Sequence, residues 1–97
     1  MPTYVSLLKY TAKGIESIKG SPKRIEAAKQ AAKAAGGQIK GIYVVMGRYD
    51  LVTVFEMPDD ESAAKFALGI GAQGNVTTET LRAFTEPEFL KLLGSLP

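Results

Sequence analysis

The sequence contains no cysteine and no histidine. Without cysteine, disulfides, thiolate nucleophiles, zinc–thiolate sites and iron–sulfur clusters are excluded. Without histidine, the chain lacks the usual general base, the usual haem ligand and the commonest metal ligand. Any chemistry would therefore have to use Asp, Glu, Tyr, Lys, Arg or a bound cofactor. The sequence demands neither a cofactor nor a metal ion, and we expect neither.

Strong charge of one sign and long apolar runs are missing as well. The 97 residues include 12 basic and 10 acidic side chains, and 45% of the residues are hydrophobic. This balance indicates one globular domain over residues 1–97 without a strong electrostatic preference for nucleic acid or membrane. No apolar run approaches the roughly 18 residues of a membrane span, and the N-terminus lacks a signal pattern. We therefore expect a cytoplasmic protein.

The segment Gly41–Met57 organises the prediction of the fold. Two runs of β-branched and aromatic residues flank residues 47–50, a pattern that is typical of a β-hairpin. Gly47 can adopt the positive φ that a tight turn often requires, and Asp50 can accept hydrogen bonds from nearby amides. Both runs are apolar on both faces, so we expect the hairpin to be covered on both sides.

The remaining elements follow from local signals. Ser21 and Pro22 favour a helix start with Ser21 as the N-cap, and Asp59 is expected to cap a second helix. Thr85 and Glu88 fit a capping box before a short apolar tail helix. The patterns together predict strands over 3–10, about 41–46, 51–57 and 75–84, with helices over about 21–35, 59–70 and 86–96.

This order, β-α-β-β-α-β plus a C-terminal helix, is the ferredoxin-like α+β pattern with a four-stranded antiparallel sheet. Both crossover helices would cover one face of the sheet. We expect the other face, with side chains such as Tyr43, Val45, Leu51 and Phe55, to pair with a second copy. The sequence thus predicts a dimeric α+β barrel, with the chain itself as its first partner.

Three separated motifs resemble those of the GYD domain family. They are Ser21-Pro22-Lys23-Arg24, the G-x-Y-D signature of Gly47, Tyr49 and Asp50, and Gly74-Asn75-Val76 leading into the run that ends at Phe84. The resemblance spans nearly the whole chain. It implies a small protein of dimeric α+β barrel type and uncharacterised function, related to barrels that include cofactor-free monooxygenases, haem enzymes and simple binding proteins.

Five polar residues are candidates for a ligand site: Arg48, Tyr49, Asp50, Glu79 and Arg82. The first three occupy the turn, where Asp50 either caps backbone amides or helps to line the mouth of a pocket. Glu79 and Arg82 lie on one strand at an odd spacing, so they face opposite sides of the sheet.

The favoured function is the binding of a small organic molecule by a homo-oligomer. A cofactor-independent monooxygenase- or isomerase-like enzyme and a structural or regulatory subunit without a ligand are the alternatives. Whether there is any catalysis stays open.

Overall fold

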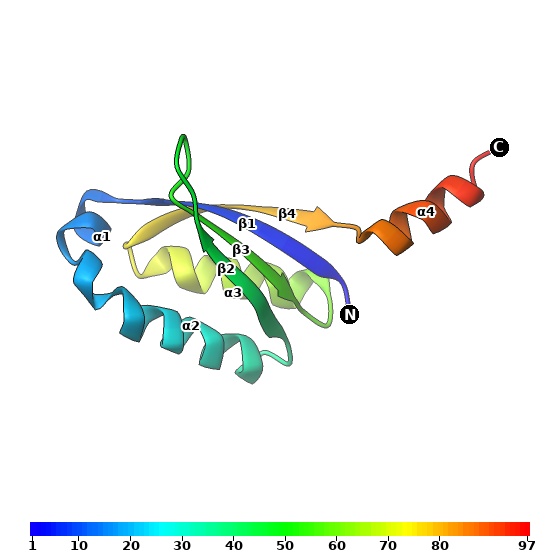
Figure 1. The fold of residues 1–97 in the computed structure, drawn as a ribbon. Coiled ribbons are helices and arrows are strands. Elements are labelled where there is room, and N and C mark those ends of the chain that lie inside the picture. The colour runs from blue at the N-terminus through cyan, green and yellow to red at the C-terminus, as the bar shows by residue number, and fades with distance from the viewer.

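The structure is a computed structural model that describes residues 1–97 (Figure 1). Its strands are β1 (Thr3–Tyr10), β2 (Gln38–Val44), β3 (Leu51–Glu56) and β4 (Val76–Ala83). Its helices are α1 (Ala12–Glu16), α2 (Ser21–Ala34), α3 (Asp60–Ala72) and α4 (Glu86–Gly94), with a 3₁₀ turn at Ile18–Gly20. The strands form one antiparallel sheet in the order β2-β3-β1-β4. The predicted ferredoxin-like α+β fold is confirmed.

The register of the sheet fixes which side chains share a face. Thr3 of β1 lies opposite Glu56 of β3 and Ala83 of β4, and Leu8 lies opposite Leu51 of β3. The pairing of β2 with β3 shifts between Ile39 and Gly41, as at a β-bulge. Successive side chains alternate between faces, so the even-numbered residues of β1 and β4 face α2 and α3.

The core lies between α2, α3 and this face of the sheet. Tyr4 and Phe55 stack with their ring centroids 5.4 Å apart, and Phe66 of α3 meets Phe55 edge-on at 5.2 Å. Ala32 of α2 and Ala63 of α3 are buried against this cluster. The small alanines let both helices approach the sheet closely, so the aromatic side chains contribute most of the buried apolar area.

The opposite face of the sheet is not covered by a helix (Figure 1). It carries half-buried valines of β1 and β3 and half-buried Leu7 of β1, together with exposed Tyr43 and Leu81. The prediction that Leu51 and Phe55 belong to this face is wrong. Tyr43 lies opposite Val52, so the free face contains Val52 and Val54, and Phe55 is fully buried on the helix side.

The helix caps test three local predictions. The side chain of Asp59 accepts a hydrogen bond from the Ser62 amide at 2.8 Å, and Thr85 with Glu88 forms the predicted capping box. Ser21 is wrong as an N-cap, because it is already helical and Gly20 precedes the helix as the cap residue. The 3₁₀ turn that runs into α2 shifts the boundary by one residue, which leaves the Ser21 hydroxyl available for contacts with other side chains.

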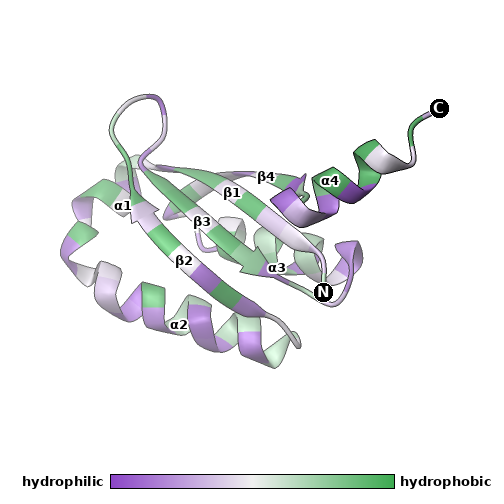
Figure 2. Ribbon diagram, turned by 45° about the vertical axis from the view of Figure 1, so that its right-hand side comes forward, coloured by the Kyte–Doolittle hydropathy of each residue, from purple (hydrophilic) through white to green (hydrophobic).

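Two groups of exposed apolar side chains lie at opposite corners of the sheet. One is at the hairpin, where Val44 is 82% exposed and Met46 is 98% exposed. The other is on α4, which extends away from the sheet beyond β4 (Figures 1 and 2). Its exposed apolar residues are Phe89, Leu90, Leu92 and Leu93. The hairpin follows the edge strand β2, and α4 follows the other edge strand, β4, at the opposite end of the sheet. The two groups therefore lie at diagonally opposite corners.

Candidate functional site

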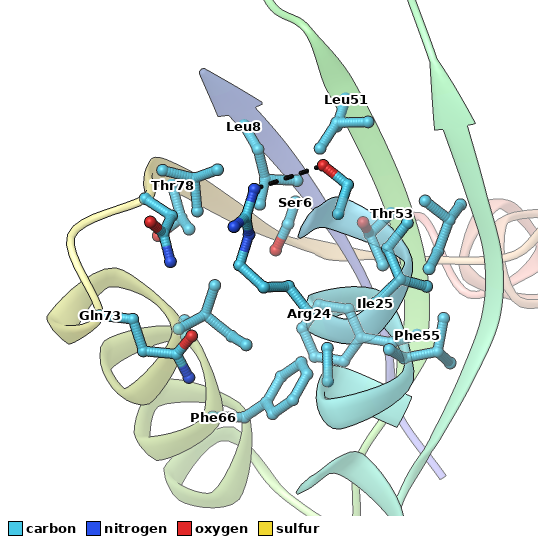
Figure 3. Close-up of a pocket in the computed structure, with 18 of the residues that line it drawn as sticks. Ser6, Leu8, Arg24, Ile25, Leu51, Thr53, Phe55, Phe66, Gln73 and Thr78 are labelled. Atoms are coloured by element: carbon cyan, nitrogen blue, oxygen red, sulfur yellow. Dashed lines mark hydrogen bonds between the residues drawn. The ribbon is translucent and has the colours of Figure 1, made fainter. Parts of the chain in front are cut away.

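A cavity of about 100 Å³ lies between α2, α3 and the helix-covered face of the sheet (Figure 3). Most of its lining is apolar, and the largest purely apolar side chains are those of Phe55 and Phe66. The lining includes no Asp or Glu, and Arg24 is its one charged residue. The cavity is therefore a partly open apolar pocket with a single positive group, which suits the binding of a small molecule.

Short side chains in facing layers leave this space unfilled. Ser6, Thr53 and Thr78 project from neighbouring strands toward the helices. Ala28 of α2 and Ala67 of α3 lie on the opposite wall. Small residues on both sides cannot meet across the gap, and the hydroxyl groups of the strand residues give parts of the wall a polar surface.

The polar end of the cavity is formed where β1 ends and α2 begins. The hydroxyl groups of Tyr10 and Ser21 lie 3.2 Å apart. The guanidinium of Arg24 donates to the Ser17 carbonyl at 2.8 Å and to the Ser21 hydroxyl at 3.4 Å. Figure 3 shows the Arg24 side chain extending from α2 toward Leu8 and Thr78, away from the phenyl rings. The charge of this arginine is thus directed to one end of the cavity.

The turn residues predicted as a site lie elsewhere. The Tyr49 hydroxyl donates to Glu79 Oε2 at 3.2 Å, and the Arg48 guanidinium lies 5.8 Å from the centre of the Tyr49 ring. Glu79 is on the free face of the sheet, opposite Leu7. The structure therefore brings Arg48, Tyr49 and Glu79 together at one edge of the free face, and none of them lines the cavity.

Asp50 anchors the hairpin to the neighbouring strand. Its carboxylate accepts the backbone N–H of Tyr10 at 2.9 Å, and its own N–H donates to the Leu8 carbonyl at 2.8 Å. Its carbonyl accepts the N–H of Val45 at 2.9 Å. Gly47 has φ 136°, a left-handed value that glycine tolerates best. These contacts agree with the interpretation of Asp50 as a residue that binds backbone amides.

Arg82 lies on the helix side of the sheet, as the odd spacing from Glu79 predicts. Its guanidinium is 4.0 Å from the Asp60 carboxylate and 4.6 Å from the centre of the Phe84 ring. Asp60 also accepts a hydrogen bond of 2.5 Å from the Tyr4 hydroxyl. Burial, followed by the hydrogen bond to Asp60 and the charge of that carboxylate, raises the pKa of Tyr4 to about 12. This cluster is separate from both the turn residues and the cavity.

Sequence reasoning missed the residues at the polar end of the cavity. Arg24 precedes Ala28 by four positions, so both lie on the same face of α2, the face that packs toward the sheet. This spacing could have indicated that Arg24 lies near the cavity. Tyr10 and Ser21 gave no such signal, because their contact depends on how β1 meets the start of α2. The structure shows no cluster of three or more acidic residues that could bind a metal ion. None of its helices has the length and apolar character that crossing a membrane requires.

Comparison with known proteins supports the class that this fold defines, a small ferredoxin-like α+β protein. FFRP-DM1, of known crystal structure, superposes with a TM-score of 0.62 at 22% identity, over 87% of this chain and 100% of the other. A protein of known structure from Thermus thermophilus gives a TM-score of 0.55 at 29% identity, over 88% of this chain and 95% of the other. A hypothetical protein from Pyrococcus horikoshii gives a TM-score of 0.57 at 24% identity, over 89% of this chain and 93% of the other.

The family is shown by sequence. The family model of the GYD domain matches residues 4–93, so this chain belongs to the GYD domain family. A curated Thermus thermophilus protein is 32% identical over 94 residues, which is 96% of this chain and 99% of the relative. That relative is named "Glutamine synthetase and cystathionine beta-lyase binding protein".

Proposed function

We propose that this protein is a homo-oligomeric binding protein that holds a small organic molecule in the cavity between α2, α3 and the sheet. The observation that carries the proposal is the cavity of about 100 Å³, with its mostly apolar lining and its single charged residue, Arg24. Such an arrangement gives affinity through apolar burial and orientation through a few polar groups.

The lining favours binding over catalysis. Apart from Arg24 and Tyr10, its polar groups are the hydroxyls and amides of Ser, Thr, Gln and Asn. A general base with a pKa near neutrality, such as histidine or a buried carboxylate, is not among the lining residues. A monooxygenase or isomerase reaction here would have to rely on the reactivity of the substrate itself, which makes it the weaker alternative.

Two exposed apolar surfaces support self-association. The free sheet face exposes Tyr43 and Leu81 beside half-buried valines, and α4 exposes its apolar side. In a two-fold dimer with crossed strands, an axis along one diagonal of the sheet brings the hairpin corner of one copy onto the α4 corner of the other, and symmetry repeats the contact. Both surfaces would then be covered by the same partner, a second copy of the chain, as a dimeric α+β barrel.

The pair formed by Tyr49 and Glu79 is a second candidate ligand site. It lies on the free face, so a dimer through that face would place it inside the barrel. Arg48 and Asp50 would support it from the turn. Arg82 faces the helices, and we assign it to the contact with Asp60.

A thermal-shift screen of small metabolites tests the cavity proposal. Ala28→Leu would fill the cavity, whereas Ala27→Leu adds the same side chain at the neighbouring exposed position. A ligand at about 100 times its Kd stabilises the folded state by about 2.7 kcal/mol, which raises the Tm by several degrees in a domain of this size. We expect compounds that stabilise the wild type and Ala27→Leu but not Ala28→Leu. A screen without any such compound would contradict the proposal.

The second candidate function is that of a regulatory subunit that binds an enzyme. The name of the Thermus thermophilus relative favours it, since that protein is described as binding glutamine synthetase and cystathionine beta-lyase. Sedimentation velocity of purified glutamine synthetase, with and without this protein, tests it directly. A faster boundary on addition would support the enzyme-binding function, and an unchanged boundary at micromolar concentrations would argue against this partner.

A further inference from the structure

We propose that the ligand of the cavity is a monocarboxylate with a short aliphatic tail and no amino group, and that Arg24 binds its carboxylate. The inference rests on the proposed function, since it names the chemical class of the molecule that the cavity holds. It is carried by the contacts of Arg24, by the groups that surround its guanidinium and by the size of the apolar part of the cavity.

Arg24 has no counter-charge. The two ion pairs of the structure join Lys65 to Glu61 and Arg82 to Asp60, so no carboxylate lies within 4.0 Å of the Arg24 guanidinium. Its acceptors are the carbonyl and hydroxyl oxygens of Ser17 and the hydroxyl of Ser21, all of them neutral. A guanidinium beside an apolar enclosure gains most from a carboxylate, which matches its planar fork of donors.

Other groups at the same end also favour a negative charge. The N-terminus of α2 begins there, and its cap residue Gly20 provides no side-chain hydrogen bond to the first turn. The positive end of the helix dipole is therefore not neutralised by an acidic cap. In the contact between Tyr10 and Ser21 one hydroxyl donates to the other, so the accepting hydroxyl can still donate its own proton to an oxygen of the ligand.

The same surroundings disfavour an ammonium group. The lining contains no Asp or Glu, so the amino group of an α-amino acid would lose its hydration beside Arg24 without gaining a negative partner. A zwitterion would place its positive charge next to the guanidinium and the helix N-terminus. The cavity should therefore distinguish a simple carboxylate from the amino acid that has the same side chain.

The apolar end limits the length of the tail. Phe55, Phe66 and Ile39 line it, and the whole cavity measures about 100 Å³. An engineered apolar cavity of about 150 Å³ holds benzene, so this volume suits a tail of about four carbons. Isovalerate, a carboxylate with a branched isobutyl tail, is the probe that fits both ends.

Isothermal titration calorimetry with isovalerate, isovaleramide and valine tests the inference. The three probes share one tail and differ in charge at the end that would face Arg24. Because a hydrogen bond to a charged group contributes about 1.5–3 kcal/mol, we expect isovalerate to bind the wild type roughly ten- to a hundred-fold more tightly than isovaleramide. Valine should bind more weakly than isovalerate. Arg24→Gln should remove the preference, whereas Lys23→Gln, at the exposed neighbouring position, should keep it.

The outcomes separate this inference from the proposed function. Equal affinity of the wild type for isovalerate and isovaleramide would overturn the carboxylate inference, and this comparison needs no variant. The carboxylate inference would also be overturned if every compound in the metabolite screen that loses its effect in Ala28→Leu were neutral or cationic. In both cases the cavity would still bind a small molecule. If no probe binds and the screen finds no Ala28→Leu-sensitive compound, the proposed function fails together with the inference.

Discussion

Tyr4 shows how one buried hydroxyl depends on its surroundings. Its ring is stacked on Phe55, and its hydroxyl donates to Asp60 at the start of α3. Burial and the neighbouring carboxylate both disfavour the tyrosinate anion, which is why the pKa of Tyr4 rises from 10.0 to about 12. The contact thus ties β1 to the first turn of α3 as long as the hydroxyl is protonated.

This pKa shift predicts a pH dependence of stability. The folded pKa lies above the unfolded value, so the contribution of Tyr4 is fully present below pH 10.0 and is lost as the pH rises toward about 12. We expect Tyr4→Phe to be less stable than the wild type below pH 10, with a difference that shrinks at higher pH. Denaturant unfolding at a series of pH values measures this difference.

Titration of tyrosinate absorbance provides an independent check. The chain has four tyrosines, and the wild-type titration should include a component near pH 12 that Tyr4→Phe lacks. A variant that retains this component would show that another tyrosine is responsible for it, and would contradict the assignment to Tyr4.

At the scale of elements, the hairpin between β2 and β3 depends on Asp50. The carboxylate of Asp50 bonds the last amide of β1, and its backbone groups bond Leu8 and Val45. Asp50→Asn should change the free energy of unfolding by only about 0.5 kcal/mol, because the Asn side-chain carbonyl can accept the same amide. Asp50→Ala should cost about 1–3 kcal/mol, because the Tyr10 amide loses its acceptor.

Equilibrium unfolding in urea measures both changes, and the two variants act as controls for each other. If Asp50→Asn is as destabilising as Asp50→Ala, the negative charge itself is required. That result would show that the charge of Asp50 strengthens its bond to the Tyr10 amide. The thermal-shift screen on Asp50→Asn and Tyr49→Phe would then show whether compounds lose their effect.

The elements differ in how far the sequence predicts them. β1, the capping box at Thr85 and the N-cap at Asp59 were predictable because each depends on residues close together in the chain. The faces of the hairpin strands were not, because the connection from Val45 to Asp50 sets the register that pairs Tyr43 with Val52. One residue of difference in that register moves Phe55 from the free face to the core.

The cavity could not be predicted for a related reason. It exists because Ser6 and Thr53 of the sheet face Ala28 and Ala67 of two different helices, and no local pattern relates these four positions. Arg24 was visible as part of the motif that resembles the GYD family, but its orientation toward the cavity depends on where the 3₁₀ turn starts α2. Such a cavity depends on the combined volume of side chains from the sheet and from both helices. The sequence of one strand or one helix does not show which side chains it will face.

In the whole molecule, the two faces of the sheet differ in what covers them. The helix side encloses the core and the candidate ligand cavity, and the other side leaves a sheet face without cover. At the corners of the sheet, α4 and the hairpin expose further apolar side chains. A monomer of this shape would leave all of these surfaces in water, and large exposed apolar surfaces mark sites of interaction. We therefore propose that a second copy of the chain covers these surfaces.

Sedimentation equilibrium of the wild type at micromolar concentration measures whether the chain forms such an oligomer. The chain has a mass of 10.4 kDa, and we expect a species of twice this mass or a multiple of it. Replacing Leu90 and Leu93 of α4 together by Glu should weaken the assembly, because both side chains are exposed in the single chain and would be buried between copies. A single species of 10.4 kDa for the wild type would contradict the claim.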